Sequence, residues 1–138
     1  MKREPAKLKH RKWHKRAGLK KGKALRGTTV DFGEFGLKAL EGTRITYAQM
    51  ESARVTIARF IKKQGKMWIR LSPDKPITTK PVEVGMGKGK GAVDHYVRDI
   101  RAGKILFELS GIPEETAREA IKRAGYKLPV KVAFVTKN

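Results

Sequence analysis

The segment over residues 85–91 has a composition suited to contact with phosphate groups. Glycine alternates there with Met86, Lys88 and Lys90, so every second residue lacks a Cβ atom. A backbone without Cβ atoms can approach a phosphate chain closely, and lysine supplies a mobile positive charge beside it. The same composition is also typical of a flexible hairpin tip with solvated lysines, and the segment alone does not decide between these two interpretations.

Two common nucleotide-binding motifs do not fit this segment. A P-loop ends in Gly-Lys-Ser or Gly-Lys-Thr, whereas Lys90 is followed by Gly91 and Ala92. A dinucleotide fingerprint opens a helix, but here glycine recurs at every second position and a strand is predicted to follow. The segment therefore predicts a glycine-rich loop and not a nucleotide pocket, with both interpretations of the loop still open.

Residues with catalytic or metal-binding chemistry are sparse. His10 and His14 stand four residues apart, a spacing that would place two imidazoles on one face of a helix. The basic residues around them would repel a metal cation, so we expect no metal site there. His95 falls within a predicted strand, and the serines lack the context of a nucleophile elbow. We predict a protein that is not an enzyme and uses no cofactor, metal or small-molecule substrate.

The N-terminal segment carries more than half of the excess positive charge. Residues 1–26 hold twelve of the 33 Lys and Arg residues and one acidic residue, a net charge of +11 out of a total of +20. Its few apolar residues follow no sustained period, so we predict that residues 1–27 form a basic arm that is disordered when free. Trp13 has no core to join within such an arm, which makes it a candidate for stacking on an unpaired base. The alternative is a tail that only keeps the protein soluble.

Composition limits the remaining possibilities. The chain has 138 residues, 39% of them hydrophobic, which is sufficient for one domain. The charge of +20 predicts a polyanionic partner, meaning nucleic acid or, as the alternative, an anionic membrane surface. The absence of cysteine excludes disulfide scaffolds and thiolate metal sites. The longest apolar run has four residues, at 132–135, so we expect no membrane-spanning helix, and no secretory signal is visible.

The clearest element is a helix that begins after Thr46. Thr46 and Gln49 form a capping-box pattern, and we expect Gly65 to end the helix. Apolar residues recur at helical spacing and predict a buried face, while the opposite face is basic. The buried face is predicted to contain Met50, Ala53, Ile57, Phe60 and Ile61, and the basic face Arg54, Arg59, Lys62 and Lys63.

The rest of the domain alternates between strands and loops. Strands are predicted at 30–39, with a break at Gly33, and at 66–72, 93–100, 104–109 and 130–136. The prolines at 73–81 should interrupt regular structure and leave Lys75 exposed on a turn. A second helix is expected from Pro113, with a buried stripe at Ala117, Ala120, Ile121 and Ala124. We therefore predict one α+β domain over residues 28–138, with two helices packed on antiparallel strands.

The order of these features resembles a known family. Six motifs carry the likeness: Lys-His-Arg-Lys-Trp-His-Lys at 9–15, Phe-Gly-Glu-Phe-Gly-Leu-Lys-Ala at 32–39, Ile-Thr at 45–46, Pro-Asp-Lys-Pro at 73–76, Met-Gly-Lys-Gly-Lys-Gly at 86–91 and Lys-Leu-Pro-Val-Lys at 127–131. Each motif alone is weak, but six in this order are specific. The chain resembles the bacterial-type ribosomal protein L-sixteen of the large subunit, in the universal family uL-sixteen.

The resemblance implies a fold, a role and partners. The fold would be an α/β-hammerhead without enzymatic activity. The protein would bind large-subunit ribosomal RNA near the aminoacyl-tRNA site, help to position A-site tRNA and help to complete subunit assembly. Its partners would be that RNA, A-site tRNA and neighbouring large-subunit ribosomal proteins, on a cytoplasmic or organellar ribosome.

The resemblance also assigns roles to particular residues. In many relatives an arginine precedes the Gly/Lys loop, and since Gly85 stands there in this chain, the RNA contact of that arginine is not carried over. The loop expected to face tRNA comprises Met86, Gly87, Lys88, Gly89, Lys90 and Gly91. The residues expected to bind ribosomal RNA are Lys9, Arg11, Lys12, Trp13, His14, Lys15, Arg16, Arg54, Arg59, Lys62, Lys63 and Lys75.

Two other classes of function remain open from the residues alone. A sequence-neutral nucleic-acid chaperone or DNA-compacting protein could use the same arm and basic helix face. An RNA-modifying enzyme with a basic guide arm would need a cofactor pocket, for which the sequence shows no motif.

Overall fold

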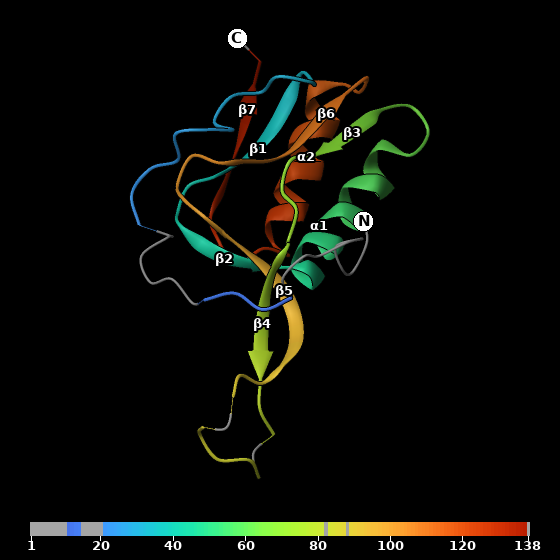
Figure 1. Cartoon of the computed structure of the whole chain (residues 1–138). Coiled ribbons are helices and arrows are strands. Elements are labelled where there is room, and N and C mark those ends of the chain that lie inside the picture. Colours follow the sequence, from blue (N-terminus) through green and yellow to red (C-terminus); the bar gives the residue numbers. More distant parts are fainter. Residues whose placement is uncertain (1–10, 15–20, 82, 88, 138) are drawn as a thin grey trace.

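The structure is a computed structural model that describes residues 11–14, 21–81, 83–87 and 89–137. These residues form two antiparallel sheets and two helices (Figure 1). This arrangement confirms the predicted α+β fold. The elements of the described residues are, in order, β1 (Phe35–Ala39), β2 (Thr43–Thr46), α1 (Tyr47–Ile61), β3 (Lys66–Ile69), β4 (Lys75–Thr79), β5 (Ala92–Ile100), β6 (Ile105–Ser110), α2 (Glu114–Gly125) and β7 (Val132–Thr136).

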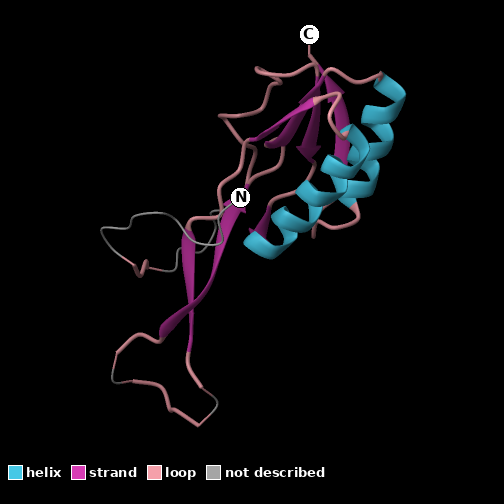
Figure 2. Cartoon of the chain, turned by 90° about the vertical axis from the view of Figure 1, so that its right-hand side faces the viewer, coloured by secondary structure: helices cyan, strands magenta, loops and turns pink. Residues whose placement is uncertain are grey.

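The core lies between the larger sheet and the helices. This sheet has the strand order β3-β6-β1-β7, and both helices cover one of its faces (Figure 2). Leu37 of β1 pairs with Phe107 of β6, and both side chains are fully buried. The strand predicted around Leu37 is therefore one of the two central strands of the larger sheet.

Helix α1 begins as its sequence predicts. The Thr46 hydroxyl accepts a hydrogen bond from the Gln49 amide at 3.2 Å, and the Gln49 side chain accepts one from the Thr46 amide at 2.9 Å. This reciprocal pair satisfies two amides that the helix itself leaves without partners. The predicted buried face is confirmed except at Phe60, which packs against the core but is only partly buried.

The end of α1 differs from the prediction. The helix stops at Ile61, and Lys62, with a φ of 50°, carries the chain out of it. Gly65 has a different role, because a Cβ atom there would lie 2.7 Å from the Ser110 carbonyl oxygen. Gly65 thus permits close approach of the chain to β6 instead of ending the helix.

Helix α2 confirms its predicted stripe. Ala117, Ala120, Ile121 and Ala124 are all buried, and α2 packs against α1. Small alanine side chains let two helices approach closely. The acidic pair Glu114 and Glu115 lies in the first turn, where it complements the positive end of the helix dipole.

The smaller sheet has the order β2-β5-β4, and neither β2 nor β4 was predicted. Strand β4 contains Pro76, which a strand tolerates at the edge of a sheet. The predicted exposure of Lys75 is therefore wrong: Lys75 begins β4, is 5% exposed, and donates a hydrogen bond to Asp99 at 2.7 Å. The prolines of this segment suggested a turn, but Pro76 lies within the edge strand β4, and Pro73 and Pro81 lie on either side of it.

Strands β4 and β5 form a hairpin that projects away from the helices, with the Gly/Lys loop at its tip (Figure 1). Residues 85–87 and 89–91 adopt neither helix nor strand, as predicted, and Lys88 lies outside the described residues.

The remaining strands are close to their predicted positions, with two differences. Residues 28–34 are not a strand, so the first predicted strand is reduced to β1. Strand β3 is shorter than expected and lies at a sheet edge, which leaves Ile69 38% exposed instead of facing inward.

Candidate nucleic-acid interface

The end of the basic arm lies against the folded domain. The Ala24 amide donates to the Ala102 carbonyl at 2.8 Å, and the Ile105 amide donates to the Gly27 carbonyl at 2.7 Å. These bonds attach the arm to the connection between β5 and β6. The boundary at residue 27, and disorder of the free arm, stay predictions.

Two residues nearer the start of the arm, Lys12 and Trp13, contact the Gly/Lys loop. Lys12 Nζ donates to the Lys90 carbonyl at 3.2 Å, and Lys90 Nζ donates to the Trp13 carbonyl. Arg11, Lys12, Trp13 and His14 are all exposed. The structure therefore brings together two segments, 77 residues apart at Lys90 and Trp13, that the sequence separately predicted as phosphate contacts. The other predicted arm residues, Lys9, Lys15 and Arg16, lie outside the described residues.

The basic face of α1 carries less free charge than its sequence suggests. Arg54 forms an ion pair with Glu51, whose pKa is held below its ordinary value by the hydrogen bond from Arg54. Spacing of three residues on a helix could have revealed this pair. Arg59, Lys62 and Lys63 are exposed, so the end of the helix keeps a positive surface.

A basic hollow that the sequence did not reveal lies between the arm and the β4–β5 hairpin. It encloses about 540 Å³ and is lined by segments that are distant in the sequence. The arm contributes Trp13, Leu25 and Arg26, whereas β5 and the connection after it contribute Arg98, Arg101 and Lys104. We name this feature the basic hollow.

Asp99 lies at the wall of the basic hollow but its charge is already engaged. One carboxylate oxygen accepts from Arg44 Nε at 2.9 Å, and the other accepts from Lys75 Nζ at 2.7 Å. Burial alone would raise the pKa of Asp99, but these two hydrogen bonds outweigh burial and hold the pKa below its ordinary value. One carboxylate thus joins all three strands of the smaller sheet.

Lys104 lies in a different electrostatic environment. Burial lowers its pKa, and the positive charges of Arg70 and Arg98 lower it further. The amino group also lies against the backbone of the arm, because a Cβ atom on Gly27 would be 2.5 Å from Lys104 Nζ. Lys104 is therefore held among other cations with restricted access to water.

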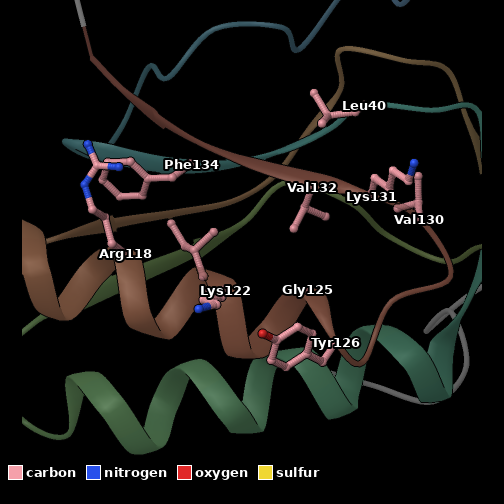
Figure 3. Close-up of a pocket in the computed structure, with 10 residues that line it drawn as sticks. Leu40, Arg118, Lys122, Gly125, Tyr126, Val130, Lys131, Val132 and Phe134 are labelled. Carbon is pink, nitrogen blue, oxygen red and sulfur yellow. The ribbon is translucent and has the colours of Figure 1, made fainter.

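A second groove, between α2 and β7, has a different character (Figure 3). Its floor is apolar: Phe134 stacks on Phe35 with ring centroids 5.5 Å apart. The Arg118 guanidinium lies 4.4 Å from the centre of the Phe134 ring and is paired with Glu114 at 2.9 Å. This groove offers less free positive charge than the basic hollow.

Among the described residues, no group of three or more His, Cys, Asp or Glu side chains is placed to hold a metal ion. Within the same ranges, neither helix has the length and hydropathy needed to cross a membrane.

The sequence of the chain matches a known family. The family described as Ribosomal protein L16p/L10e matches the chain over residues 5–135, a range that runs from within the arm to the last strand and includes both helices and the Gly/Lys loop. The match thus spans nearly all of the 138 residues. The chain belongs to the ribosomal protein L16p/L10e family, and it is a structural protein of the large ribosomal subunit.

Proposed function

We propose that this protein binds large-subunit ribosomal RNA beside the aminoacyl-tRNA site, helps to complete subunit assembly and helps to position A-site tRNA. The observation that carries the proposal is the position of Trp13. Its carbonyl accepts a hydrogen bond from Lys90 of the loop, and the same residue lines the basic hollow. The arm, loop and hollow therefore form one connected basic surface, which suits a phosphate chain better than an isolated patch would.

Family membership favours this role over the alternatives. A sequence-neutral chaperone or a DNA-compacting protein could use the same basic surface, but the whole chain matches a ribosomal family. The same match supports a non-enzymatic role on a cytoplasmic or organellar ribosome. Cosedimentation separates these classes, because after a high-salt wash a ribosomal protein stays with large subunits and a chaperone is lost.

Deleting residues 1–22 should make RNA binding less sensitive to salt. The deletion removes most of the arm's charge but keeps Ala24 and Gly27, which are bonded to the domain. The dependence of log K on log salt has a slope of about −0.7 per neutralised phosphate on single strands, so the loss of six contacts reduces it by about four. The measurement is affinity for a single-stranded ribosomal RNA fragment between 50 and 200 mM salt. An unchanged slope would mean that the arm makes no phosphate contacts.

Reversing the charges of the Gly/Lys loop should affect tRNA more than subunit binding. In a Lys88→Glu, Lys90→Glu variant, many other contacts to ribosomal RNA are intact, so incorporation into large subunits should be normal. Two negative charges at the loop would oppose an approaching tRNA phosphate chain, and accommodation of aminoacyl-tRNA should slow.

The control for this variant is the pair Lys127→Glu, Lys131→Glu, at exposed lysines outside the loop. Slow accommodation confined to the loop variant supports the proposal. Equal rates in both variants and the wild type would contradict a tRNA-facing role and leave the loop as a solvated hairpin tip.

A further inference from the structure

We propose that the basic hollow is a site for one RNA phosphodiester group, with the adjoining nucleoside placed against Trp13. This inference rests on the proposed RNA binding and identifies a place where that binding occurs. It follows from the shape and the charge of the hollow and from the fixed backbone around Lys104.

The shape is concave and includes both kinds of surface that a nucleotide needs. A volume of about 540 Å³ lies within the range of ligand pockets in proteins. Cationic side chains line it beside Trp13 and two leucines, Leu25 and Leu71. Phosphate oxygens accept hydrogen bonds from Arg and Lys, while a base or sugar packs on an aromatic or apolar surface.

The charge of the hollow is strongly positive because its nearest carboxylate is already engaged. Asp99 accepts hydrogen bonds from Arg44 and Lys75. Arg98 is paired with Asp74 at 2.8 Å, but both side chains are well exposed and that pair is weak in water. Arg26 and Lys104 add further positive charge to the lining. An anion in the hollow would therefore meet mainly attractive charges.

Lys104 lies close to another cation of the lining, Arg98, in the chain without a ligand. Its pKa is lowered by burial and by the charges of Arg70 and Arg98, which means that the protonated amine is less stable there than in water. A phosphodiester beside the amine would reverse that effect. Binding of RNA should therefore raise the pKa of Lys104.

Backbone hydrogen bonds fix the position of Lys104 in the chain. Ile105, the next residue, donates its amide to the Gly27 carbonyl, and the Ala39 amide donates to the Lys104 carbonyl at 2.8 Å. The absence of a Cβ atom on Gly27 leaves room for the amino group beneath the arm. The charge is thus preorganised on a sheet connection instead of being carried by a flexible tail, which reduces the entropy that binding must remove.

The test uses the full chain and an eight-nucleotide oligouridylate at 150 mM salt, where nonspecific contacts are weakened. Lys104→Met keeps the length of the side chain and removes its charge. We expect about tenfold weaker binding in this variant, from the loss of one charge-assisted hydrogen bond. The matched control, Lys127→Met, removes an exposed charge outside the hollow and should change the affinity by less than about twofold.

Two further measurements locate the ligand. In a Trp68→Phe background, fluorescence of Trp13 should change when the oligonucleotide binds, and NMR titration of the Lys104 side chain should show its pKa rise. The thermal midpoint of Lys104→Met should equal or exceed that of the wild type, because the variant removes a charge held among other cations.

The outcomes separate the two proposals. If the wild-type chain does not bind the oligonucleotide or a ribosomal RNA fragment, the proposed RNA-binding function fails. If it binds both, but Lys104→Met binds as tightly as Lys127→Met and Trp13 does not respond, the proposed site is overturned while the function stands.

Discussion

Replacing Glu108 with alanine should lower the free energy of unfolding by about 3–5 kcal/mol, the range expected when one partner of a buried charged network is removed. Glu108 lies on the central strand β6 and is fully buried. One of its carboxylate oxygens accepts hydrogen bonds from the amides of Asp31 and Phe32 at 2.6 and 3.1 Å, and the other accepts from Arg70 at 3.3 Å. Without the carboxylate, these donors lose an acceptor that is itself fully buried on β6.

Urea unfolding of the full chain at pH 7 measures this effect. Glu108→Gln should be less damaging than alanine, because the amide keeps one acceptor oxygen and nearly the same shape. Glu41→Ala is the control, since Glu41 is exposed in a loop and its loss should leave the urea midpoint unchanged. Equal midpoints for the alanine variants at Glu108 and Glu41 would contradict a stabilising role for the buried carboxylate.

The same variant should have a local effect at the surface. Glu108 fixes the backbone of Phe32, which is 61% exposed and lies with its ring centre 6.4 Å from that of Trp68. Arg70 lies over the Phe32 ring at 5.3 Å. Loss of the carboxylate should free this segment, so Trp68 fluorescence should change before global unfolding begins.

The parts of the fold that the sequence predicted depend on local interactions. The start of α1 follows from Thr46 and Gln49, which are three residues apart, and the buried stripe of α2 follows from its own periodicity. Strand β4 depends instead on its pairing with β5, since Pro76 lies opposite Tyr96. Nothing in the segment around Pro76 specifies that partner, so the local pattern of prolines gave the wrong prediction for Lys75.

The candidate interface also divides into features set by local composition and features that depend on contacts between distant segments. Composition alone singled out the arm and the Gly/Lys loop, because glycine and basic residues are concentrated there. The basic hollow was missed because Arg26, Arg98 and Lys104 belong to separate segments that only the folded chain brings together. The buried role of Glu108 was also missed, because the amides that donate to it are 76 and 77 residues away in the sequence. In the sequence alone, Glu108 is an ordinary polar residue of a predicted strand.

Asp99 should also contribute strongly to stability, and its contribution should depend on pH. Its side chain is 5% exposed and that of Lys75 is 7% exposed, so water cannot readily take the place of either partner. Asp99→Ala leaves Lys75 as a buried cation without this carboxylate and removes the partner of Arg44. We expect a loss of about 3–5 kcal/mol in the free energy of unfolding at pH 7.

The control lies on the same hairpin. Asp74 pairs with Arg98 at 2.8 Å, but both side chains are well exposed, so Asp74→Ala should lower the free energy of unfolding by less than about 1 kcal/mol. A double variant, Lys75→Met with Asp99→Ala, should lose less unfolding free energy than the two single variants lose in sum. The double variant removes the buried cation together with its carboxylate partner. Strict additivity would mean that Lys75 and Asp99 stabilise the fold independently.

The pH dependence follows from the lowered pKa of Asp99 in the folded state. An unfolded aspartate titrates near pH 3.9, so the stabilisation is complete above that value and is lost as the pH falls through the lower folded pKa. Protonated Asp99 leaves Lys75 as poorly paired as it is in Asp99→Ala. The difference in unfolding free energy between wild type and variant should therefore be constant from about pH 5 to 7 and shrink below about pH 4, whereas a difference that persists undiminished to pH 2 would show that the ionised carboxylate is not its source.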